Sequence, residues 1–390
     1  MRDLRARPLR AAVIVAALGL AACDRSSDAG GPRGKLPSKA PVSAALQATP
    51  AWDPANTRVF VVCLAWFKGE SPEHSSFTLE DRNDGALVGL FESRGVPAKN
   101  ITFLEDAAAT TAGVRAALTA ALAASKPGET LIFYYGSHGG YDPKAEAWRF
   151  STFDGSIPMT WARETIDAEF RGARALLLSD SCYSGGLVAL AEKPSARVAY
   201  AAISSTYRHN VAWSAWRFID AVMRGFAGSN VVDADADGYV TLGELGRFTE
   251  RHMAFVAEGK PELFMSPGFS KETRIASVSK PKKDERIGRY VKAEWHGAWY
   301  KAEVEDADGA RVKVHYTSYD HKSDEWLGPE RVKEPDAPRF APGDKVEAQA
   351  SGSKKWYPAK VLERWEAMHL VHWDGYSSAY DEWMGPSRIR

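Results

Sequence analysis

The 390-residue sequence has few cysteines, no excess of charge of either sign and a single long apolar run. Its three cysteines exclude a disulfide-rich scaffold. Fifty Lys and Arg residues balance 50 Asp and Glu residues, so we expect no nucleic-acid partner held by bulk electrostatic attraction. Hydrophobic residues make up 45% of the chain, which excludes wholesale disorder. The length predicts two to three domains of about 150 residues each.

The apolar run follows a basic N-terminus. Four arginines precede residues 11–22 (AAVIVAALGLAA), and Cys23 follows them. A basic segment and about a dozen apolar residues are typical of a signal peptide, and a spanning helix needs about 20. The end of the run, Leu-Ala-Ala-Cys, resembles the cleavage box of bacterial lipoproteins. The resemblance implies a signal peptide over 1–23, lipidation of Cys23 and a membrane-anchored, exported protein of the cell envelope. The alternative is a plain secretory signal with a chance cysteine.

Residues 24–56 are rich in Ser, Gly, Pro and Ala and show no helical or strand periodicity, which predicts a flexible linker. Residues 57–278 then alternate between short apolar runs and helical patterns. This alternation predicts an α/β domain, with a mainly parallel sheet covered by helices on both faces. Functional residues of such sheets lie beyond the carboxyl ends of the strands. The predicted strands cover 58–66, 101–104, 128–135, 173–179 and 198–204, and the predicted helices cover 79–95, 110–125 and 160–170.

Two predicted strands end in glycine-rich motifs with reactive side chains. Gly-Ser-His-Gly-Gly places His138 after one strand, and Asp-Ser-Cys-Tyr-Ser-Gly-Gly places Cys182 after another. An imidazole helps to form the thiolate of a nucleophilic cysteine, and glycines let N–H groups face an oxyanion. Either motif alone is weak, because a lone His or Cys at a strand end is usually structural. Together they predict a Cys–His nucleophilic site.

These motifs resemble those of the caspase/metacaspase-like cysteine peptidases, over about 220 residues. An Asn-Asp pair at 83–84, followed by an amphipathic helix, fits the same family. The resemblance implies that Cys182 is the nucleophile and His138 the general base and acid. It also implies that the backbone N–H groups of Gly139 and Cys182 form the oxyanion hole. It implies no third fixed residue and no cofactor required for catalysis.

The same resemblance implies a substrate pocket. The acids that hold a cationic side chain in metacaspases match Asp84 and Asp180, which indicates cleavage after Arg or Lys. The alternatives are a helix N-terminal acid for Asp84 and a loop-closing hydrogen bond for Asp180. Tyr183 departs from the family, where many metacaspases have His. Cys63, in the first strand, is predicted to be a core residue, and a Cys63–Cys182 disulfide would silence the enzyme.

Residues 233–244 fit the twelve-residue calcium loop of an EF-hand, with acids at positions 1, 3, 5 and 12 and Gly at position 6. The predicted flanking helices cover 212–226 and 242–257, but six residues separate the first helix from the loop. The alternative is an acidic turn in which Glu244 starts a helix. The predicted Ca²⁺ ligands are Asp233, Asp235, Asp237, Tyr239 (carbonyl), Thr241 and Glu244.

After a charged linker (279–286), two related segments follow, at 287–335 and 340–390. Motifs from Trp299 onward recur 57 residues later, among them Val-His-aromatic and Asp-Glu-Trp. Each segment predicts four or five short strands and resembles the Tudor/agenet/chromo-barrel group of SH3-like barrels. We interpret the recurring His315 and His372 as strand residues rather than metal ligands.

In that group, aromatic side chains form cages for methylated lysine or arginine. The alternative for each aromatic residue is a place in the core of a small barrel. The cage candidates are Trp299, Tyr316, Tyr319 and Trp326 in the first segment and Trp356, Trp373, Tyr376 and Trp383 in the second.

Together, these features predict an exported cysteine-type endopeptidase with a peptide or protein substrate and two small all-β barrels that bind an unknown partner. The rival prediction is a catalytically silent caspase-like scaffold whose barrels carry the function. Intact Cys and His motifs weigh against the rival. Acyl transfer instead of hydrolysis is a third option, because a thioester intermediate permits both.

Overall fold

The computed structural model describes residues 51–69, 75–77, 82–212, 216–281, 284–336 and 338–390. The predicted signal peptide, Cys23 and almost all of the 24–56 linker lie outside these residues. So does the start of the helix expected from residue 79. Within the described residues, no helix combines the length and the apolar character needed to cross a membrane.

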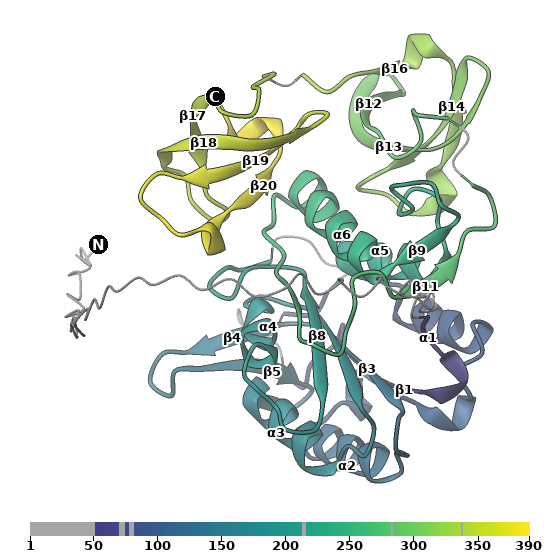
Figure 1. Cartoon of the computed structure of the whole chain (residues 1–390), viewed down its shortest axis with the longest axis vertical. Coiled ribbons are helices and arrows are strands. Elements are labelled where there is room, and N and C mark those ends of the chain that lie inside the picture. Colours follow the sequence, from purple (N-terminus) through teal and green to yellow (C-terminus); the bar gives the residue numbers. More distant parts are fainter. Residues whose placement is uncertain (1–50, 70–74, 78–81, 213–215, 282–283, 337) are drawn as a thin grey trace, which may run out of the picture. The chain divides into compact units, whose positions relative to one another are not determined.

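A six-stranded sheet forms the centre of the α/β domain (Figure 1). Its strand order is β10-β8-β7-β3-β1-β2, and all neighbours are parallel except β10, which pairs antiparallel with β8. Strands β1, β3 and β7 are buried along almost their whole length, which explains their nearly uninterrupted apolar sequences. The strands are β1 (Thr57–Cys63), β2 (Ile101–Glu105), β3 (Thr130–Gly136), β7 (Arg174–Asp180), β8 (Ala199–Ser204) and β10 (Leu263–Met265).

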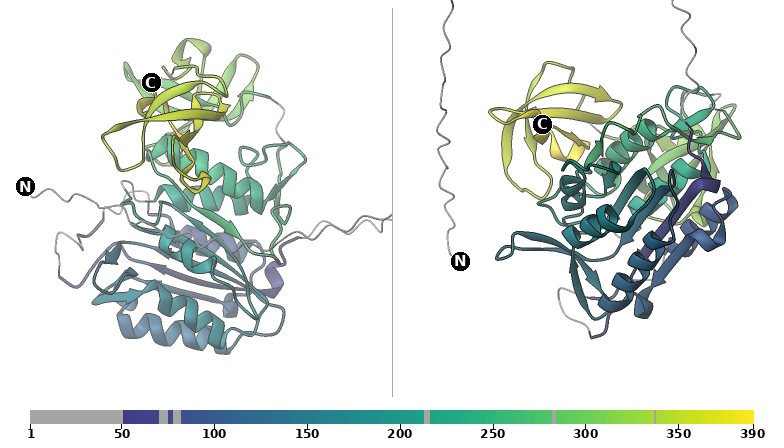
Figure 2. Two further views of the ribbon diagram at one scale, coloured as in Figure 1. Left: turned by 60° about the vertical axis from the view of Figure 1, so that its left-hand side comes forward. Right: turned by 60° about the horizontal axis from the view of Figure 1, so that its bottom comes forward.

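Helices cover both faces of this sheet, as the ribbon views of Figure 2 show. Side chains alternate between the faces: Val59 and Val61 pack against α1, α5 and α6, whereas Phe60 and Val62 pack against α2, α3 and α4. Thr110 caps the start of α2 by accepting a hydrogen bond from the Gly113 N–H. The helices are α1 (Asp84–Ser93), α2 (Thr111–Ala123), α3 (Met159–Glu169), α4 (Gly185–Ala191), α5 (Arg217–Ala227) and α6 (Leu242–Val256).

Two small antiparallel sheets complete the α/β domain. One has the order β4-β5-β6, in which β5 and β6 form a hairpin. The other joins β9 to β11. Helix α4 and strand β10 were not predicted from the sequence. The strands are β4 (Gly139–Asp142), β5 (Ala147–Thr152), β6 (Gly155–Pro158), β9 (Tyr239–Thr241) and β11 (Arg274–Ser277).

The C-terminal residues form two antiparallel sheets, which we call barrel 1 and barrel 2. In barrel 1, β16 follows β15 in the chain but pairs with β12 at the opposite edge, so the sheet curls round. In barrel 2, Ile389 bridges to Ala348 in the same way. Barrel 1 contains β12 (Tyr290–Trp295), β13 (Ala298–Asp308), β14 (Arg311–Tyr316), β15 (Glu325–Leu327) and β16 (Val332–Lys333). Barrel 2 contains β17 (Lys345–Gln349), β18 (Trp356–Trp365), β19 (Met368–Trp373) and β20 (Glu382–Met384).

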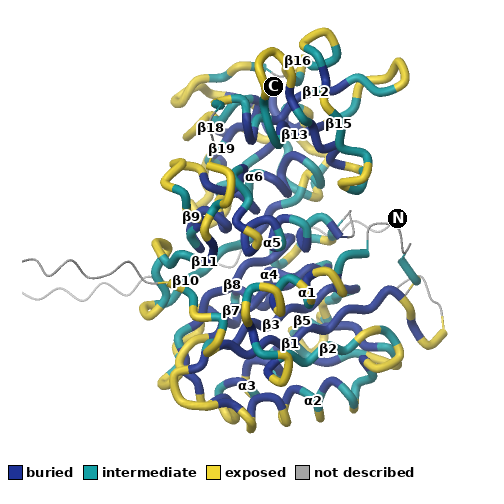
Figure 3. Tube along the Cα trace, turned by 90° about the vertical axis from the view of Figure 1, so that its right-hand side faces the viewer, coloured by how far each residue is buried: buried dark blue, intermediate teal, exposed yellow. Residues whose placement is uncertain are grey.

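This architecture confirms the predicted fold class: a mainly parallel, helix-covered sheet followed by two small all-β units. The tube in Figure 3 shows the buried backbone concentrated along the central strands and the exposed backbone at loops and barrel tips. Each barrel has a core of its own, built around Val314 in barrel 1 and Val371 in barrel 2. Cys63 and Cys182 are both free thiols. Cys63 is fully buried, which confirms its assignment to the core.

Candidate active site

Strand register brings the two glycine-rich motifs together. β3 and β7 are adjacent and parallel, and Gly136 lies opposite Asp180. His138 and Cys182 each lie two residues beyond this pair, so both emerge at the same edge of the sheet. The Ser137 N–H donates to the Asp180 carbonyl oxygen at 3.0 Å. A side chain on Gly139 would collide with the Cys182 carbonyl oxygen, so the two main chains lie in direct contact there.

Cys182 is partly buried at the end of β7. The Ala212 N–H lies 3.3 Å from its sulfur and donates to it. Burial raises the pKa of the Cys182 thiol, the Ala212 backbone lowers it, and the nearby Asp180 raises it again. The thiol therefore needs a base to ionise it near neutral pH. The next residue, Tyr183, has a φ of 58°, a left-handed conformation that costs a non-glycine residue about 1–3 kcal/mol. The Tyr183 N–H donates to the Asn210 carbonyl oxygen at 2.7 Å and holds this turn.

The imidazole of His138 is held in a defined orientation. Its Nε2 lies 2.8 Å from the Ser75 carbonyl oxygen. Because a carbonyl oxygen only accepts, this contact assigns the proton of the neutral ring to Nε2 and makes Nδ1 the basic nitrogen. The rings of Phe77 and Phe67 lie 4.3 and 5.3 Å from the imidazole ring, centroid to centroid. Sequence reasoning missed Ser75 and Ala212, because both act through backbone atoms and carry no side-chain signal.

The Gly139 N–H makes no hydrogen bond to the neighbouring strand β5. Gly139 faces Phe150, and the Ser151 N–H donates to the His138 carbonyl oxygen at 3.1 Å. That pattern makes Gly139 and Phe150 a non-hydrogen-bonded pair, so the Gly139 N–H points away from β5. The Tyr135 hydroxyl lies 2.6 Å from the same His138 carbonyl oxygen and fixes the loop. This N–H lies beside the Cys182 backbone, where the sequence leads us to expect an oxyanion hole.

Asp84, the first residue of α1, is buried and already holds a guanidinium. Arg82 binds it through two nitrogens, with Nε 3.0 Å from Oδ1 and Nη2 2.7 Å from Oδ2. The Arg82 Nη1 also lies 2.7 Å from Asp106 Oδ2. The Asp84 Oδ1 accepts from the Gly85 N–H at 2.9 Å as well, the contact expected of an acid at a helix start. The chain's own arginine thus shows that this acid accommodates a guanidinium.

Asp180, at the end of β7, is buried and carries no comparable partner among the described contacts. Burial raises the pKa of Asp180 to about 7, and a hydrogen bond from the Ser205 side chain opposes the rise. Asp84 and Asp180 lie on the same side of the sheet, around Cys63. Burial raises the pKa of the Cys63 thiol, and both carboxylates raise it further. The two acids expected from the sequence therefore both lie near Cys63, beside the strand ends.

The calcium-type loop brings three predicted ligands together. Asp233, Asp235 and Glu244 each offer an oxygen, and these atoms lie within 4.8 Å of one another. Asp233 is fully buried, and its Oδ1 has no hydrogen-bond partner. Tyr239 forms a non-hydrogen-bonded pair with Ser277 of β11, so its carbonyl points away from that strand. The orphaned oxygen and the outward carbonyl fit a cation ligand set.

Other contacts in the loop serve the fold. Glu244 forms a capping box with Thr241: its Oε2 accepts from the Thr241 N–H at 2.9 Å. Asp237 lies 3.7 Å from Arg274. The loop thus combines the acidic helix start with the geometry of a cation site, and the sequence had offered these as alternatives.

Barrel 1 contains a cluster of four aromatic rings, Trp295, Tyr300, Tyr316 and Tyr319. All six pairs have centroids 5.2–6.3 Å apart, and five of the six are near perpendicular. Tyr316 and Tyr319 were predicted as cage residues, whereas Trp295 and Tyr300 were missed.

The cage prediction is wrong for Trp299 and Trp326. These side chains are 41% and 40% exposed, and Lys333 and Arg311 respectively cover their rings. Both positions alternate to the outer face of the sheet, away from the aromatic cluster. In barrel 2, the four predicted cage residues have different surroundings. Trp373 is buried in the core, and Tyr376 is exposed. Trp356 stacks with Arg390, and Trp383 packs against Met368.

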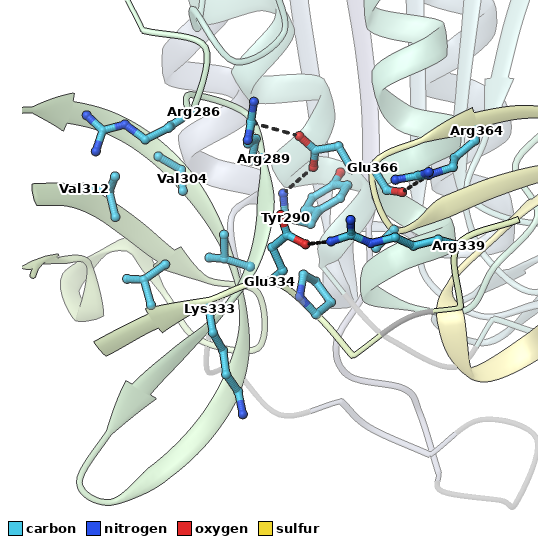
Figure 4. Close-up of a pocket in the computed structure, with 14 residues that line it drawn as sticks. Arg286, Arg289, Tyr290, Val304, Val312, Lys333, Glu334, Arg339, Arg364 and Glu366 are labelled. Atoms are coloured by element: carbon cyan, nitrogen blue, oxygen red, sulfur yellow. Dashed lines mark hydrogen bonds and ion pairs between the residues drawn. The ribbon is translucent and has the colours of Figure 1, made fainter. Parts of the chain in front are cut away.

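A cavity of about 460 Å³ lies elsewhere, lined by residues of both barrels (Figure 4). Neither Cys182 nor His138 lines it. Valines form its apolar wall, and its charged rim is paired internally. Arg289 contacts Glu366, Arg339 contacts Glu334, and the Arg364 guanidinium donates to the Glu366 carbonyl oxygen.

Comparisons with known proteins agree with this division of the chain. Residues 286–331 match the family model of the histone methyltransferase Tudor domain, so barrel 1 is a Tudor-like domain. No curated protein matches the sequence. Among solved structures, protein GSU0716 from Geobacter sulfurreducens has a TM-score of 0.41 and 17% identity, covering 57% of this chain and 99% of its own. Caspase-1 from Spodoptera frugiperda has a TM-score of 0.39 and 11% identity, covering 58% and 88%.

Both structural likenesses are low in identity and in TM-score. The fold assignment rests on the strand order and pairing described above, which define a mainly parallel α/β sheet. Neither likeness bears on the chemistry of the site.

Proposed function

We propose that the α/β domain is a cysteine-type endopeptidase. The observation that carries this proposal is the parallel register of β3 and β7, which delivers His138 and Cys182 to one edge of the sheet. The contact of His138 Nε2 with Ser75 supports it further, since it directs the basic Nδ1 to the role of proton acceptor.

In the proposed reaction, His138 Nδ1 takes the proton of the Cys182 thiol, and the sulfur attacks the substrate carbonyl carbon. The Gly139 and Cys182 N–H groups receive the developing oxyanion. The imidazolium then gives its proton to the leaving amine, and a thioester to Cys182 remains. Water, deprotonated by His138, attacks the thioester and releases the carboxylic acid and the thiol. The Ala212 N–H stabilises negative charge on the sulfur.

The same site favours a basic residue before the scissile bond. Asp180 offers a carboxylate near the catalytic strand ends, and Asp84 demonstrates bidentate binding of a guanidinium through its contact with Arg82. In this proposal Asp180 is the principal acid for the substrate side chain, and Asp84 is shared with Arg82.

The test is hydrolysis of fluorogenic peptides with Arg, Lys, Asp or Ala before the cut, under reducing conditions. The full chain is compared with Cys182→Ala and with Cys63→Ala as the matched thiol control. Cleavage after Arg or Lys that only Cys182→Ala abolishes supports the proposal. Cleavage restricted to Asp keeps the peptidase and removes the acid pocket. Absence of turnover by the folded wild-type protein favours the silent scaffold.

A second candidate function belongs to barrel 1. The rings of Trp295, Tyr300 and Tyr319 are only partly buried and lie edge to face with one another, an arrangement suited to a methylated ammonium group through cation–π attraction. The ring cluster is retained only in part in barrel 2, where Ala350 occupies the position of Trp295. Titration with a trimethyllysine peptide tests this: we expect binding that Trp295→Ala abolishes and Trp299→Ala leaves unchanged. Equal binding of unmethylated lysine contradicts the cage.

Two further proposals concern Ca²⁺ and membrane attachment. Residues 233–244 would hold Ca²⁺ through Asp233, Asp235, Asp237, Thr241, Glu244 and the Tyr239 carbonyl, with a structural role. We expect Ca²⁺ to raise the thermal midpoint of unfolding of the wild-type protein and not that of Asp233→Ala.

Lipidation of Cys23 would tether the protein to the cell envelope. Incorporation of labelled fatty acid, lost in Cys23→Ser, tests the anchor, and a soluble, unlabelled mature protein contradicts it.

A further inference from the structure

Barrel 1 carries a cluster of potential metal ligands that barrel 2 lacks. One donor atom from each of Glu305, His315, His321 and Asp324 lies within 4.8 Å of the other three. His315 Nδ1 is 2.8 Å from Asp324 Oδ1, and His321 Nδ1 is 3.1 Å from Asp324 Oδ2. His321 Nδ1 is also 3.5 Å from Glu305 Oε1. Donors around a tetrahedral zinc ion are separated by about 3.3–3.6 Å, so small shifts convert these contacts into a metal shell.

The repeat shows which of these residues the barrel itself requires. His315 and Asp324 recur as His372 and Asp381, whose Nδ1 and Oδ1 lie 2.6 Å apart. This pair is therefore a common feature of both barrels. Glu305 and His321, in contrast, correspond to Leu362 and Ser378. The two residues that complete the four-ligand cluster are specific to barrel 1.

Backbone geometry directs the unmatched acid toward the cluster. The pairing of β13 with β14 shifts by one residue between Val304 and Asp306, so Glu305 occupies a β-bulge. The same bulge occurs in barrel 2 between Val361 and Glu363, where Leu362 is 41% exposed. A bulge re-aims a side chain, and here it brings a carboxylate onto His321.

Outer contacts hold the four side chains in place. His321 Nε2 lies 3.1 Å from Asp220 Oδ1, so a metal on Nδ1 would leave Nε2–H as a donor to a carboxylate. That arrangement is typical of metal-bound histidines and fixes their orientation. Lys313 Nζ contacts Glu305 Oε2 at 3.3 Å and Asp324 Oδ2 at 3.2 Å.

The cluster is accessible from solvent. A cavity of about 730 Å³ is lined by His315, His321 and Asp220 and reaches Arg82. The His321 side chain is 48% exposed, whereas Asp324 and His315 are 3% and 4% exposed. A metal ion can therefore enter beside His321 and bind to two groups that are otherwise buried.

We propose that Glu305, His315, His321 and Asp324 form a binding site for a divalent transition metal of the zinc class. Two imidazole nitrogens and two carboxylate oxygens are the donor set that Zn²⁺, Ni²⁺ and Co²⁺ accept, whereas Ca²⁺ and Mg²⁺ prefer oxygen alone. Because Asp220 lies on α5 and the four ligands lie in barrel 1, the bound metal also ties barrel 1 to the α/β domain.

The test uses the full chain carrying Cys182→Ala, which removes the thiol as a competing zinc ligand. The chelator-treated protein is titrated with Zn²⁺ against a chromophoric chelator, and a Co²⁺ sample gives the visible spectrum. We expect one equivalent of Zn²⁺ at this site, and a Co²⁺ spectrum of four-coordinate intensity. X-ray absorption of the zinc form should show two imidazole ligands.

The double variant Glu305→Leu with His321→Ser copies barrel 2, so the fold is expected to tolerate it. Glu305→Leu with His321→Ser should weaken Zn²⁺ binding by about 100-fold or more, and Asp220→Asn by about tenfold. His372→Ala, the matched control, should change it less than twofold. No stoichiometric binding, or binding that the double variant leaves unchanged, overturns the proposal. If the double variant does not fold, the X-ray absorption spectrum of the zinc form tests the site instead. Fewer than two imidazole ligands in that spectrum overturns the proposal.

Discussion

The pH dependence of substrate selection tests the acid pocket through Asp180. Burial of this carboxyl raises its pKa to about 7, so the carboxylate forms as the pH rises through neutrality. A cationic side chain before the scissile bond gains its partner only in that state. The ionised fraction rises from about one tenth to about nine tenths between one pH unit below and one above the pKa. Selectivity for arginine should therefore rise about tenfold between pH 6 and pH 8.

The assay measures kcat/KM for two peptides that differ only by arginine or citrulline before the cut. Citrulline has nearly the same shape without the charge, so the ratio cancels the titration of Cys182 and His138, which both substrates share. Asp180→Asn should make the ratio low and constant across this range. Asp308→Asn, at an exposed ion pair in barrel 1, should leave the wild-type curve unchanged. A ratio that is flat or falls with pH in the wild type refutes the role of Asp180, as does a slope that persists in Asp180→Asn.

Three further predictions concern the thiols and the buried ion pairs. In the folded protein, a thiol reagent should label Cys182 and not Cys63, as peptide mapping would show. Arg82→Gln leaves the buried Asp84 carboxylate without its cation and should lower the free energy of unfolding in urea by about 3 kcal/mol. Arg224→Met should cost about 3–5 kcal/mol because Glu303 is fully buried 2.6 Å away, and adding Glu303→Met should restore most of that loss.

Each of these has a contrary outcome. Labelling of Cys63 at the rate of Cys182 would mean that the first strand opens readily. Arg311→Gln, at an exposed pair with Asp308, is the control for the ion pairs and should change stability by at most about 0.5 kcal/mol. A similar small effect for Arg82→Gln or Arg224→Met would contradict the burial argument. An Arg224/Glu303 double variant no more stable than the single one would contradict the pairing.

The central strands could be predicted because they are buried on both faces and read as apolar runs. Sequence also placed His138 and Cys182 at strand ends, and parallel pairing alone then requires that they share an edge. The contacts that orient them could not be predicted. Ser75 and Ala212 contribute backbone atoms, and any residue type other than proline offers the same carbonyl and N–H.

The barrels show where repeat analysis succeeds and fails. The offset of 57 holds from Trp299 onward, but strand pairing places Val291 opposite Ala302 and Val346 opposite Ala359. The first strands are thus offset by 55, because the chain between these paired residues is two residues longer in barrel 2. Trp295 lies in that shifted strand and aligns with Ala350, so it has no aromatic counterpart in the second repeat.

Ion pairs were the least predictable part of the sites. Arg82 lies two residues from Asp84, yet nothing in the sequence shows that its guanidinium binds that carboxylate rather than solvent. The ligand cluster of barrel 1 depends on a bulge that aims Glu305. A comparison of the two repeats would have marked Glu305 and His321 as departures, although only the fold brings them together.

The most direct test of the peptidase is covalent trapping at the active site. A peptidyl acyloxymethyl ketone with arginine at its end is added to the full chain, and intact mass and peptide mapping locate the adduct. We predict a single adduct on Cys182 that His138→Ala slows by at least about 100-fold, while Cys63→Ala leaves it unchanged. No adduct on the folded protein, or an adduct that forms equally fast without His138, would contradict a Cys182–His138 peptidase.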